Sequence, residues 1–462
     1  MQKVNENILS SSIHDPSGFL FQRDKTLYRQ INLSYKESYY LFIKSNLYHN
    51  LLKEHLLIPH TETSIKGYSK QGCYKVIQPE YIPFISYPYE WCFSQLKDAA
   101  LVTLRIQKIA LESGMTLKDA SAYNIQFHKG KPLLIDTLSF EKYKEGTPWV
   151  AYRQFCEQFL APLVLMSSED VRLNQLTKIY LEGIPLDLTS SLLPLKTKLR
   201  PSLFAHLHLH SLAQKHLTRH RFLKNPPSVS KIGLKGLIDN LENNIEKLSL
   251  PSRRSPWNDY YNKTNYPKKG VIAKKHIVSR FLNLLKPKIV WDLGANIGIY
   301  SKVAAQKNIL TIAIDNDHTV VETCYLDNKK VGEKNILPLV IDITNPSASM
   351  GWNNQEQRSL IERGPADTIL ALALLHHLAI THNLPFANIA RFFSQAGRSL
   401  IIEFIQKEDS QVQKLLTTRD DIFNTYTQGN FEKEFLVYFS IRDKVPIPTS
   451  LRTIYVMEKR NK

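Results

Sequence analysis

Cysteine is scarce in this sequence, and long apolar runs are missing. Only four of 462 residues are cysteines, Cys73, Cys92, Cys156 and Cys324, and none of them forms a CxxC pair. Neither a disulfide framework nor a zinc knuckle is indicated, and a reduced cytoplasm fits best. No apolar run approaches the roughly 20 residues that cross a bilayer, and the polar start lacks the layout of a secretory signal. We therefore expect a cytoplasmic protein without a transmembrane segment.

Acidic residues are also in the minority. Sixty Lys and Arg stand against 42 Asp and Glu, for a net charge of +18. Such a charge attracts polyanions, so RNA or an acidic partner is one interpretation. A solvated basic surface is the other, because no signature of an RNA-binding module accompanies the charge. The 43% hydrophobic and 22% charged residues are ordinary for a globular protein.

The chain is longer than the usual length of a domain with a single hydrophobic core. Three regions differ in residue composition and hydrophobic pattern. We predict an α+β domain over residues 1–188, a basic helical connector over 189–254 and an α/β domain over 255–462. The first region has two amphipathic patterns, 36–57 and 93–115, which predict helices because their apolar residues recur at three and four. In the connector, His206, His210 and His216 share part of a helix face. No Cys or carboxylate completes a metal site there, so a basic face is favoured.

From Trp257 onward, short apolar strands alternate with helical patterns. The strands are nearly continuous apolar runs, which is typical of a parallel sheet covered on both faces. After the first strand comes a turn with two glycines, Gly294 and Gly298, that allow a ligand to approach the backbone closely. A dinucleotide fingerprint would be GxGxxG, but Asn296 stands at the middle glycine. The nicotinamide interpretation is weakened accordingly.

The turn resembles motif one of the class I S-adenosylmethionine-dependent methyltransferases, Asp-x-Gly-x-x-x-Gly, which Asp292, Gly294 and Gly298 match. The resemblance implies a Rossmann-like, seven-stranded fold over the C-terminal half, with S-adenosyl-L-methionine as cofactor. It places the cofactor's methionine end against the turn, including Ala295 and Asn296, and its amino group at Asp292. The resemblance also implies that ribose hydroxyls are held at the end of the second strand, here Asp315 and Asn316. It further implies that the end of the third strand, here Asp342, faces the adenine amino group.

The fourth strand is followed by His376 and His377. A Leu-His-His sequence resembles the family again, near the transferred methyl, and either histidine is a candidate base for an acceptor that must lose a proton. The alternative is structural, with one histidine capping the next helix and the other packed beneath it. The Asn/Asp-Pro-Pro-aromatic sequence of the amine-methylating members is absent here. Trp257, Tyr260 and Tyr261, just before the fold, either form a lid or pack on the sheet edge.

The first half contains a second constellation, Asp119, Asn124 and Asp136. It resembles the catalytic and metal-binding segments of protein-kinase-like phosphotransferases, which implies Asp119 as base and Asn124 and Asp136 as ligands of Mg²⁺ on ATP. The glycine-rich phosphate loop is absent, and Arg29 replaces the strand lysine. Ordinary turn chemistry also explains these residues. We favour a degenerate kinase-like domain that binds the methyl acceptor or a partner.

The whole chain also resembles bacterial proteins described as ribosomal-protein-methyltransferase-like or nodulation-related. We predict a methyltransferase enzyme whose N-terminal domain selects an unidentified acceptor. Two alternatives stay open at this point. One is a bifunctional enzyme with a live kinase-like phosphotransferase site, and the other is an RNA-binding or scaffold protein with a non-catalytic methyltransferase fold.

Overall fold

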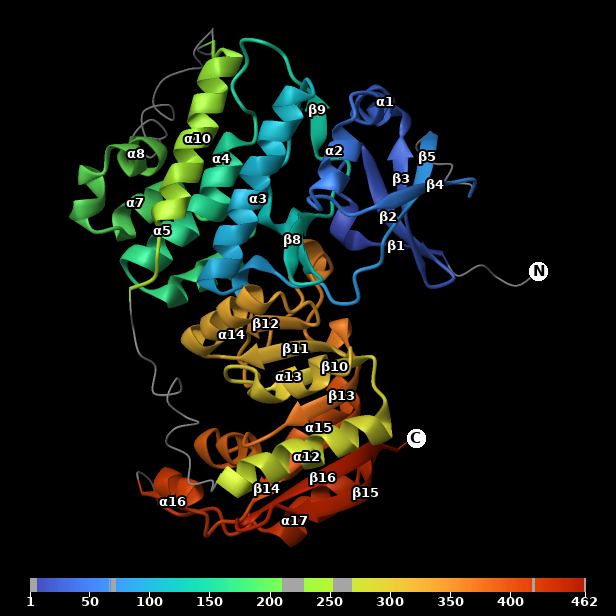
Figure 1. The fold of residues 1–462 in the computed structure, drawn as a ribbon, viewed down its shortest axis with the longest axis vertical. Coiled ribbons are helices and arrows are strands. Elements are labelled where there is room, and N and C mark those ends of the chain that lie inside the picture. The colour runs from blue at the N-terminus through green and yellow to red at the C-terminus, as the bar shows by residue number, and fades with distance from the viewer. Residues whose placement is uncertain are drawn as a thin grey trace. The chain divides into compact units, whose positions relative to one another are not determined.

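The computed structural model describes residues 6–65, 67, 72–209, 228–251, 268–417 and 420–460. The chain divides into two compact units. The first contains Met1–Ser252 with Ser349–Gln357, and the second contains Arg253–Ala348 with Arg358–Lys462. Each unit has its own main sheet together with helices (Figure 1), so the mixed α/β character expected from the sequence is confirmed. The lid predicted from Trp257, Tyr260 and Tyr261 lies outside the described residues.

The first unit begins with a five-stranded antiparallel sheet in the order β1-β2-β3-β5-β4. Its strands are β1 (Glu6–Ile8), β2 (Gly18–Arg23), β3 (Thr26–Asn32), β4 (His60–Thr63) and β5 (Cys73–Pro79). Between β3 and β4 the chain forms α1 (Lys36–Lys44) and α2 (Leu47–Lys53). The sequence predicted one helix here. The helix is interrupted because Asn46 has a left-handed φ of 60°.

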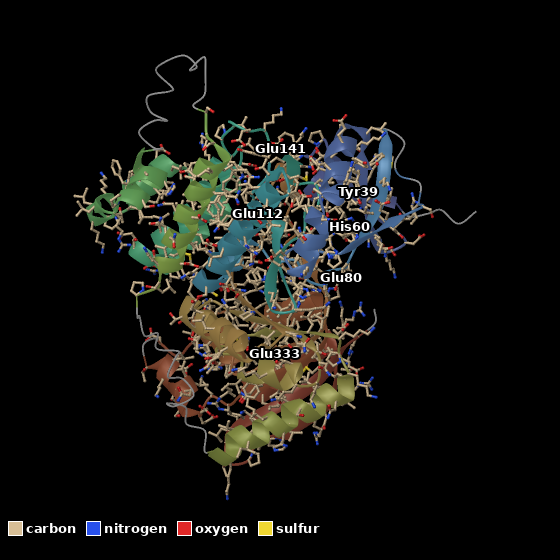
Figure 2. All side chains as sticks on the ribbon, turned by 45° about the horizontal axis from the view of Figure 1, so that its top comes forward. Tyr39, His60, Glu80, Glu112, Glu141 and Glu333 are labelled. Atoms are coloured by element: carbon tan, nitrogen blue, oxygen red, sulfur yellow. The ribbon has the colours of Figure 1, made fainter. Side chains whose placement is uncertain are left out.

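Aromatic and polar side chains join the α1 helix to this sheet. The Tyr39 hydroxyl donates to Glu62 Oε1 at 3.2 Å and lies 3.2 Å from His60 Nε2. Figure 2 labels Tyr39 and His60. Tyr39 is 2% exposed, so its hydroxyl needs such partners. The contacts fix α1 against β4.

The rest of the first unit is mainly helical. Its long helix α3 (Phe93–Glu112) confirms the helix predicted over 93–115. Two small hairpins follow: β6 (Met115–Leu117) with β9 (Phe140–Lys142), and β7 (Ile125–His128) with β8 (Lys131–Leu134). The other α-helices among the described residues of this unit are α4 (Tyr152–Phe155), α5 (Ala161–Ser168), α6 (Leu176–Ile179), α7 (Leu186–Leu192), α8 (Pro201–Leu203) and α10 (Lys231–Lys247). Lys108 of α3 lies 2.6 Å from Asp239 of α10, which ties these two helices together.

The second unit is built on a seven-stranded sheet in the order β12-β11-β10-β13-β14-β16-β15 (Figure 1). Its strands are β10 (Ile289–Leu293), β11 (Leu310–Asp315), β12 (Ile336–Val340), β13 (Ala366–Ala371), β14 (Gly397–Ile405), β15 (Phe439–Pro446) and β16 (Arg452–Lys459). The first five are parallel, and β16 is antiparallel to both β14 and β15. Because β10 pairs with β11 on one side and β13 on the other, the strand order reverses at β10. This is the switch point where open sheets of this kind bind ligands.

Helices cover both faces of this sheet. They are α12 (Lys268–Leu285), α13 (Ile299–Ala305), α14 (His318–Val331), α15 (Phe386–Ala396), α16 (Ser410–Leu416) and α17 (Gln428–Leu436). On one face, Phe281 of α12 and Val456 of β16 share an apolar core. The preceding residue of β16, Tyr455, contacts Phe431 of α17, with ring centroids 5.1 Å apart. Neighbouring residues of a strand point to opposite faces, so both faces of the sheet are buried.

Candidate functional site

A cavity of about 250 Å³ lies in the second unit, where β10, β11, β12 and β13 end. All four strands are parallel, so their carboxyl ends meet at one edge of the sheet, at its switch point. Six of the residues predicted to bind a cofactor line this cavity: Asp292, Gly294, Asn296, Asp315, Asn316 and Asp342. The structure thus brings the predicted strand-end residues to one place.

The turn after β10 requires its two glycines. Gly294 and Gly298 have φ angles of 73° and 77°, and Asn296 between them has 53°, all in the left-handed region. At Gly298 a Cβ atom would also meet Cys324 Sγ at 2.7 Å. Only glycine can adopt this φ and also leave room for the Cys324 side chain of α14. The packing of the turn against α14 therefore requires glycine at position 298.

The backbone amides of this turn are already hydrogen-bonded. Gly294 N and Ala295 N both donate to Ile314 O. Asn296 N donates to Asp315 Oδ2, Ile297 N to Asn296 Oδ1 and Gly298 N to Ala295 O. All five donor–acceptor distances are 2.7–3.0 Å. A pyrophosphate at such a turn depends on amides that point at the ligand. Because these five amides donate within the protein, the turn is poorly suited to a phosphate.

Asp292 is the most deeply buried carboxylate of the cavity. Its side chain is at the end of β10, with the residue 2% exposed, and Ser301 Oγ donates to Oδ2 at 2.6 Å. Burial raises the pKa of Asp292 to about 6, although the Ser301 hydrogen bond and the Lys274 charge oppose the rise. A positive group on a ligand would stabilise the ionised form, so Asp292 is suited to a cation.

The two other strand-end carboxylates are held by the backbone. Asp315 accepts from Asn296 N through Oδ2 at 2.9 Å and from Asp317 N through Oδ1 at 3.0 Å, and burial raises its pKa. A carboxylate oxygen can accept more than one hydrogen bond, so Asp315 keeps capacity for ligand hydroxyls. Asp342 is more exposed, and its Oδ1 accepts from both the amide and the hydroxyl of Thr344. Both carboxylates are oriented without a ligand.

Lys274 also lines the cavity, and the sequence analysis did not identify it. The residue is 2% exposed, and its Nζ donates to Glu403 Oε2 at 2.6 Å. The same Glu403 oxygen accepts from the amide of Ala373 at 2.7 Å. Ala373 lines the cavity with a left-handed φ of 53°. Glu403 therefore holds both a cation and a strained turn at the cavity wall.

Two signals in the sequence could have found this pair. Glu403 interrupts the apolar run of β14, and a lone acid in a buried strand needs a partner. Lys274 falls on the apolar phase of α12, four residues before the buried Val278. Both signals predict a buried charge, but neither gives the identity of its partner.

The two candidate histidines lie in different environments. His377 lines the cavity, whereas His376 is not among its lining residues and is 3% exposed. The centroids of the His376 and His377 rings are 4.2 Å apart. Burial lowers the pKa of His377 to about 4 and that of His376 well below its usual value. His382 also lines the cavity and was not predicted. Of the predicted pair, only His377 is placed to meet a ligand.

The cavity therefore combines three carboxylates with one buried ammonium group. The acidic side chains are Asp292, Asp315 and Asp342, and the ammonium group is that of Lys274. The lining also includes the apolar side chains of Leu372 and Leu374. This arrangement suits a partly apolar ligand with more positive than negative groups and with hydroxyls to donate.

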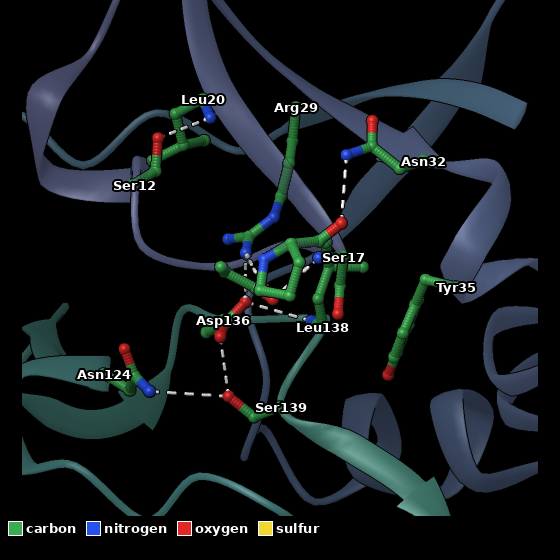
Figure 3. A network of polar contacts seen from close by, with 12 residues as sticks. Ser12, Ser17, Leu20, Arg29, Asn32, Tyr35, Asn124, Asp136, Leu138 and Ser139 are labelled. Carbon is green, nitrogen blue, oxygen red and sulfur yellow. Dashed lines mark hydrogen bonds and ion pairs between the residues drawn. The ribbon is translucent and has the colours of Figure 1, made fainter. Parts of the chain in front are cut away.

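The residues predicted as a kinase-like site lie in the first unit, and Figure 3 labels two of them, Asn124 and Asp136. Asp136 accepts from Arg29 Nη2 at 2.6 Å through Oδ1 and from Ser139 Oγ at 2.7 Å through Oδ2. Asn124 Nδ2 donates to the same Ser139 hydroxyl at 3.4 Å. Asp119 instead accepts from Ser121 N and Gln154 Nε2. The structure thus links Asn124 to Asp136 through Ser139, and Arg29 is a direct partner of Asp136.

The connector histidines have hydrogen-bonding roles. His206 contacts the Tyr152 hydroxyl and Asn240, and His208 contacts the hydroxyls of Ser190 and Thr197. His210 and His216 lie outside the described residues. Among the described residues, no group of three His, Cys, Asp or Glu side chains is placed to hold a metal ion. Within the same ranges, no helix has the length and apolar character needed to cross a bilayer.

The chain is similar along nearly its whole length to a nodulation protein. It is 32% identical over 459 residues to nodulation protein NoeA of Rhizobium meliloti (strain 1021), which covers 98% of this chain and 96% of NoeA. No family model matches the chain. The chain belongs to the same family as NoeA, which confirms the predicted resemblance to nodulation-related proteins.

Solved structures give weaker similarities. Magnesium protoporphyrin IX methyltransferase (ChlM) from Synechocystis PCC 6803, with bound SAH, matches 44% of this chain and 92% of its own, at 18% identity and a TM-score of 0.32. The bifunctional kinase-methyltransferase WbdD matches 44% of this chain and 41% of its own, at 14% identity and a TM-score of 0.29. These TM-scores are low, so function must be inferred from the site itself.

Proposed function

We propose that the chain is an S-adenosylmethionine-dependent methyltransferase and that the cavity of the second unit holds the cofactor. One observation carries the proposal. Three strand-end carboxylates surround a glycine turn whose amides are already hydrogen-bonded. S-adenosylmethionine has a sulfonium and an ammonium group but no phosphate, so its charges complement this site, whereas those of a dinucleotide do not.

Each carboxylate has a separate role in this proposal. Asp292, next to Ser301, binds the ammonium group, and the glycine turn lies against the methionine part. Asp315 accepts hydrogen bonds from ribose hydroxyls with the help of Asn316, and Asp342 faces the adenine. The order of these residues along the sheet supports the assignment, because they end β10, β11 and β12, which are successive neighbours.

The chemistry of transfer places few demands on the protein. When bound, S-adenosylmethionine supplies a methyl group made electrophilic by its sulfonium. The protein mainly binds and orients the two reactants, and a base is needed only if the acceptor must lose a proton. His377 is the candidate base. Burial lowers the pKa of His377 to about 4, so its ring is neutral at neutral pH and can accept a proton. The same shift makes it a weak base, which suits an acceptor that loses its proton readily.

We assign acceptor selection to the N-terminal domain, predicted over 1–188. The cavity residues all come from the interval between Val271 and His382, so they account for a cofactor but not for the rest of the chain. A phosphotransferase is not part of the proposal. Both oxygens of Asp136 already accept hydrogen bonds from protein groups, one of them from Arg29.

Calorimetric titration of S-adenosylmethionine into the full chain tests the proposal. We expect binding in the wild type, and loss of binding in Asp292→Ala and Asp315→Ala. Asp327→Ala is the matched control, because Asp327 is a carboxylate of α14 outside the cavity. Thermal melts show whether each variant is folded. A folded wild type that gives no heat overturns the proposal and favours a scaffold with a non-catalytic fold.

A positive titration leads to the acceptor. Transfer of a labelled methyl group to fractionated cell components identifies the acceptor class, and His377→Gln distinguishes a base from a structural histidine. Loss of transfer with cofactor affinity unchanged supports the base. Unchanged transfer means that no proton is removed by His377.

A further inference from the structure

A long stretch of the first unit contains no acidic residue. Between Asp187 and Asp239 the sequence has nine Lys and Arg residues and neither Asp nor Glu. Half of the chain's net charge of +18 therefore comes from this stretch. Blocks of one sign are typical of contact with an oppositely charged partner. The composition alone does not distinguish a nucleic acid from a membrane.

One described part of the stretch has a distinctive exposed surface. A short 3-10 helix over Leu195–Leu199 exposes Leu195 by 77% and Leu199 by 83%. Lys196, Lys198 and the next residue, Arg200, are exposed as well. We call these five side chains the leucine–lysine turn. The leucine–lysine turn therefore presents two exposed leucines, four residues apart in the chain, together with three cations on one short helical turn.

The leucine–lysine turn is held in place from beneath. Thr197, at its centre, is 2% exposed, and its hydroxyl donates to Pro194 O at 2.7 Å and lies 3.1 Å from His208 Nε2. The other ring nitrogen of His208 is 2.7 Å from the Ser190 hydroxyl. Thr197 thus faces inward with its polar group satisfied. The two leucines, by contrast, lie on the solvent-exposed side of the turn.

We propose that the leucine–lysine turn docks on an anionic lipid surface. In peripheral membrane binding, apolar side chains such as leucine enter the boundary of the acyl chains, while Lys and Arg side chains stay at the anionic headgroups. A nucleic acid would use the cations but would gain nothing from the leucines, since base recognition relies on aromatic stacking or hydrogen bonds. The exposed leucines therefore favour a lipid surface. This proposal does not depend on the proposed methyltransferase activity.

Co-sedimentation of the full chain with vesicles tests the proposal. We expect binding to vesicles of phosphatidylcholine and phosphatidylserine, little binding to phosphatidylcholine alone, and weaker binding as salt is raised. Leu195→Ser with Leu199→Ser should weaken binding by about tenfold per leucine. Lys196→Glu with Lys198→Glu should weaken it by roughly fivefold or more per lysine. These side chains are exposed, so the thermal midpoint should not change.

The control is another largely exposed apolar residue, which has acidic rather than basic neighbours. Ile422 is 66% exposed and follows Asp420 and Asp421, so Ile422→Ser removes an apolar side chain that has acidic neighbours. This variant should keep the binding of the wild type. An equal loss in Ile422→Ser and in the leucine variant would mean that exposed apolar area in general, not the leucine–lysine turn, causes binding.

Two other occupants are outcomes of the same experiments. In the first, the chain binds single-stranded RNA and not the vesicles. If the lysine substitutions weaken that RNA binding and the leucine substitutions do not, the partner is a nucleic acid and the proposal is overturned. If sedimentation velocity shows a dimer that the leucine substitutions dissociate, the turn is a contact between copies and the proposal is equally overturned. A wild type that binds no anionic vesicle also overturns it.

Discussion

Arg29 and Asp136 form a buried ion pair, with 2.6 Å between Nη2 and Oδ1. Their side chains are 8% and 12% exposed. Arg29 comes from β3 and Asp136 follows β8, and Asp15 lies 3.5 Å from the same guanidinium nitrogen. The pair therefore joins the five-stranded sheet to the segment that the sequence analysis compared with a metal site. The kinase-like resemblance implied that Asp136 binds Mg²⁺. In the structure, the guanidinium group of Arg29 provides the positive charge beside Asp136 instead.

Replacement of Arg29 should destabilise the first unit strongly. In Arg29→Met, Asp136 remains buried without its cation, and breaking such a pair typically costs about 3–5 kcal/mol. Urea unfolding of the full chain measures the change. Arg172→Met is the control, because Arg172 pairs with Asp170 at 80% exposure, and an exposed pair contributes at most about 1 kcal/mol. Similar small losses in both variants would show that the Arg29 pair is not important for stability.

Magnesium and ATP should not stabilise the wild-type chain. The Asp136 carboxylate already accepts from Arg29, Leu138 N and the Ser139 hydroxyl, which leaves little capacity for a divalent ion. Thermal melts with and without Mg-ATP check this expectation. A magnesium-dependent rise in the melting temperature that Asp136→Ala abolishes would instead establish the bifunctional alternative.

Affinity for S-adenosylmethionine should fall in mild acid. Burial raises the pKa of Asp292 to about 6, so the empty site takes up a proton below that pH and loses a charge that binds the cation. We expect about a tenfold loss of affinity between about pH 7 and about pH 5. Calorimetry across this range measures it. Asp292→Asn should bind more weakly and show a smaller slope, and equal slopes would assign the proton to another group, such as Asp315.

The same shift predicts an opposite effect on the stability of the empty protein. The pKa of Asp292 is raised on folding from 3.8 to about 6, so its contribution is fully present below pH 3.8 and is lost as pH rises through about 6. Asp292→Asn does not undergo this loss. The variant should therefore gain stability relative to the wild type as pH rises through this window, as urea unfolding at several pH values would show.

Gly298→Ala should be costly for two separable reasons. Its φ of 77° strains any residue with a Cβ, and that Cβ would meet Cys324 Sγ at 2.7 Å. We expect a loss of about 3 kcal/mol. Gly332→Ala is the control for strain alone, because its φ is 68° but no atom lies within 4 Å, and about 1 kcal/mol is expected there. In a Cys324→Ala background, the cost at Gly298 should approach that of Gly332→Ala.

The helix interruption at Asn46 shows a limit of local patterns. The apolar spacing over 36–57 predicted one helix, but the structure has two, α1 and α2, with Asn46 in the left-handed region between them. Asparagine tolerates this conformation better than most residues, so the sequence permitted the break. Periodicity alone could not locate it, because the two helices keep a similar apolar pattern on both sides.

What the sequence by itself determined is the alternation of strands and helices after β10 and the acids at the strand ends. Both are local, since a strand and the residue that ends it are neighbours in the chain. Asp292, Asp315 and Asp342 could therefore be predicted together, and they line one cavity. Parallel strands bring their carboxyl ends to one edge, so the sequence also predicted that these residues meet.

Only the tertiary structure decided which buried charges became partners. Lys274 and Glu403 are 129 residues apart, and Arg29 and Asp136 lie on different elements of the first unit. Each pair depends on which elements become neighbours and on how completely the folded chain removes water from both charges. Desolvation is a property of the whole packed unit, so no local pattern of residue types specifies it.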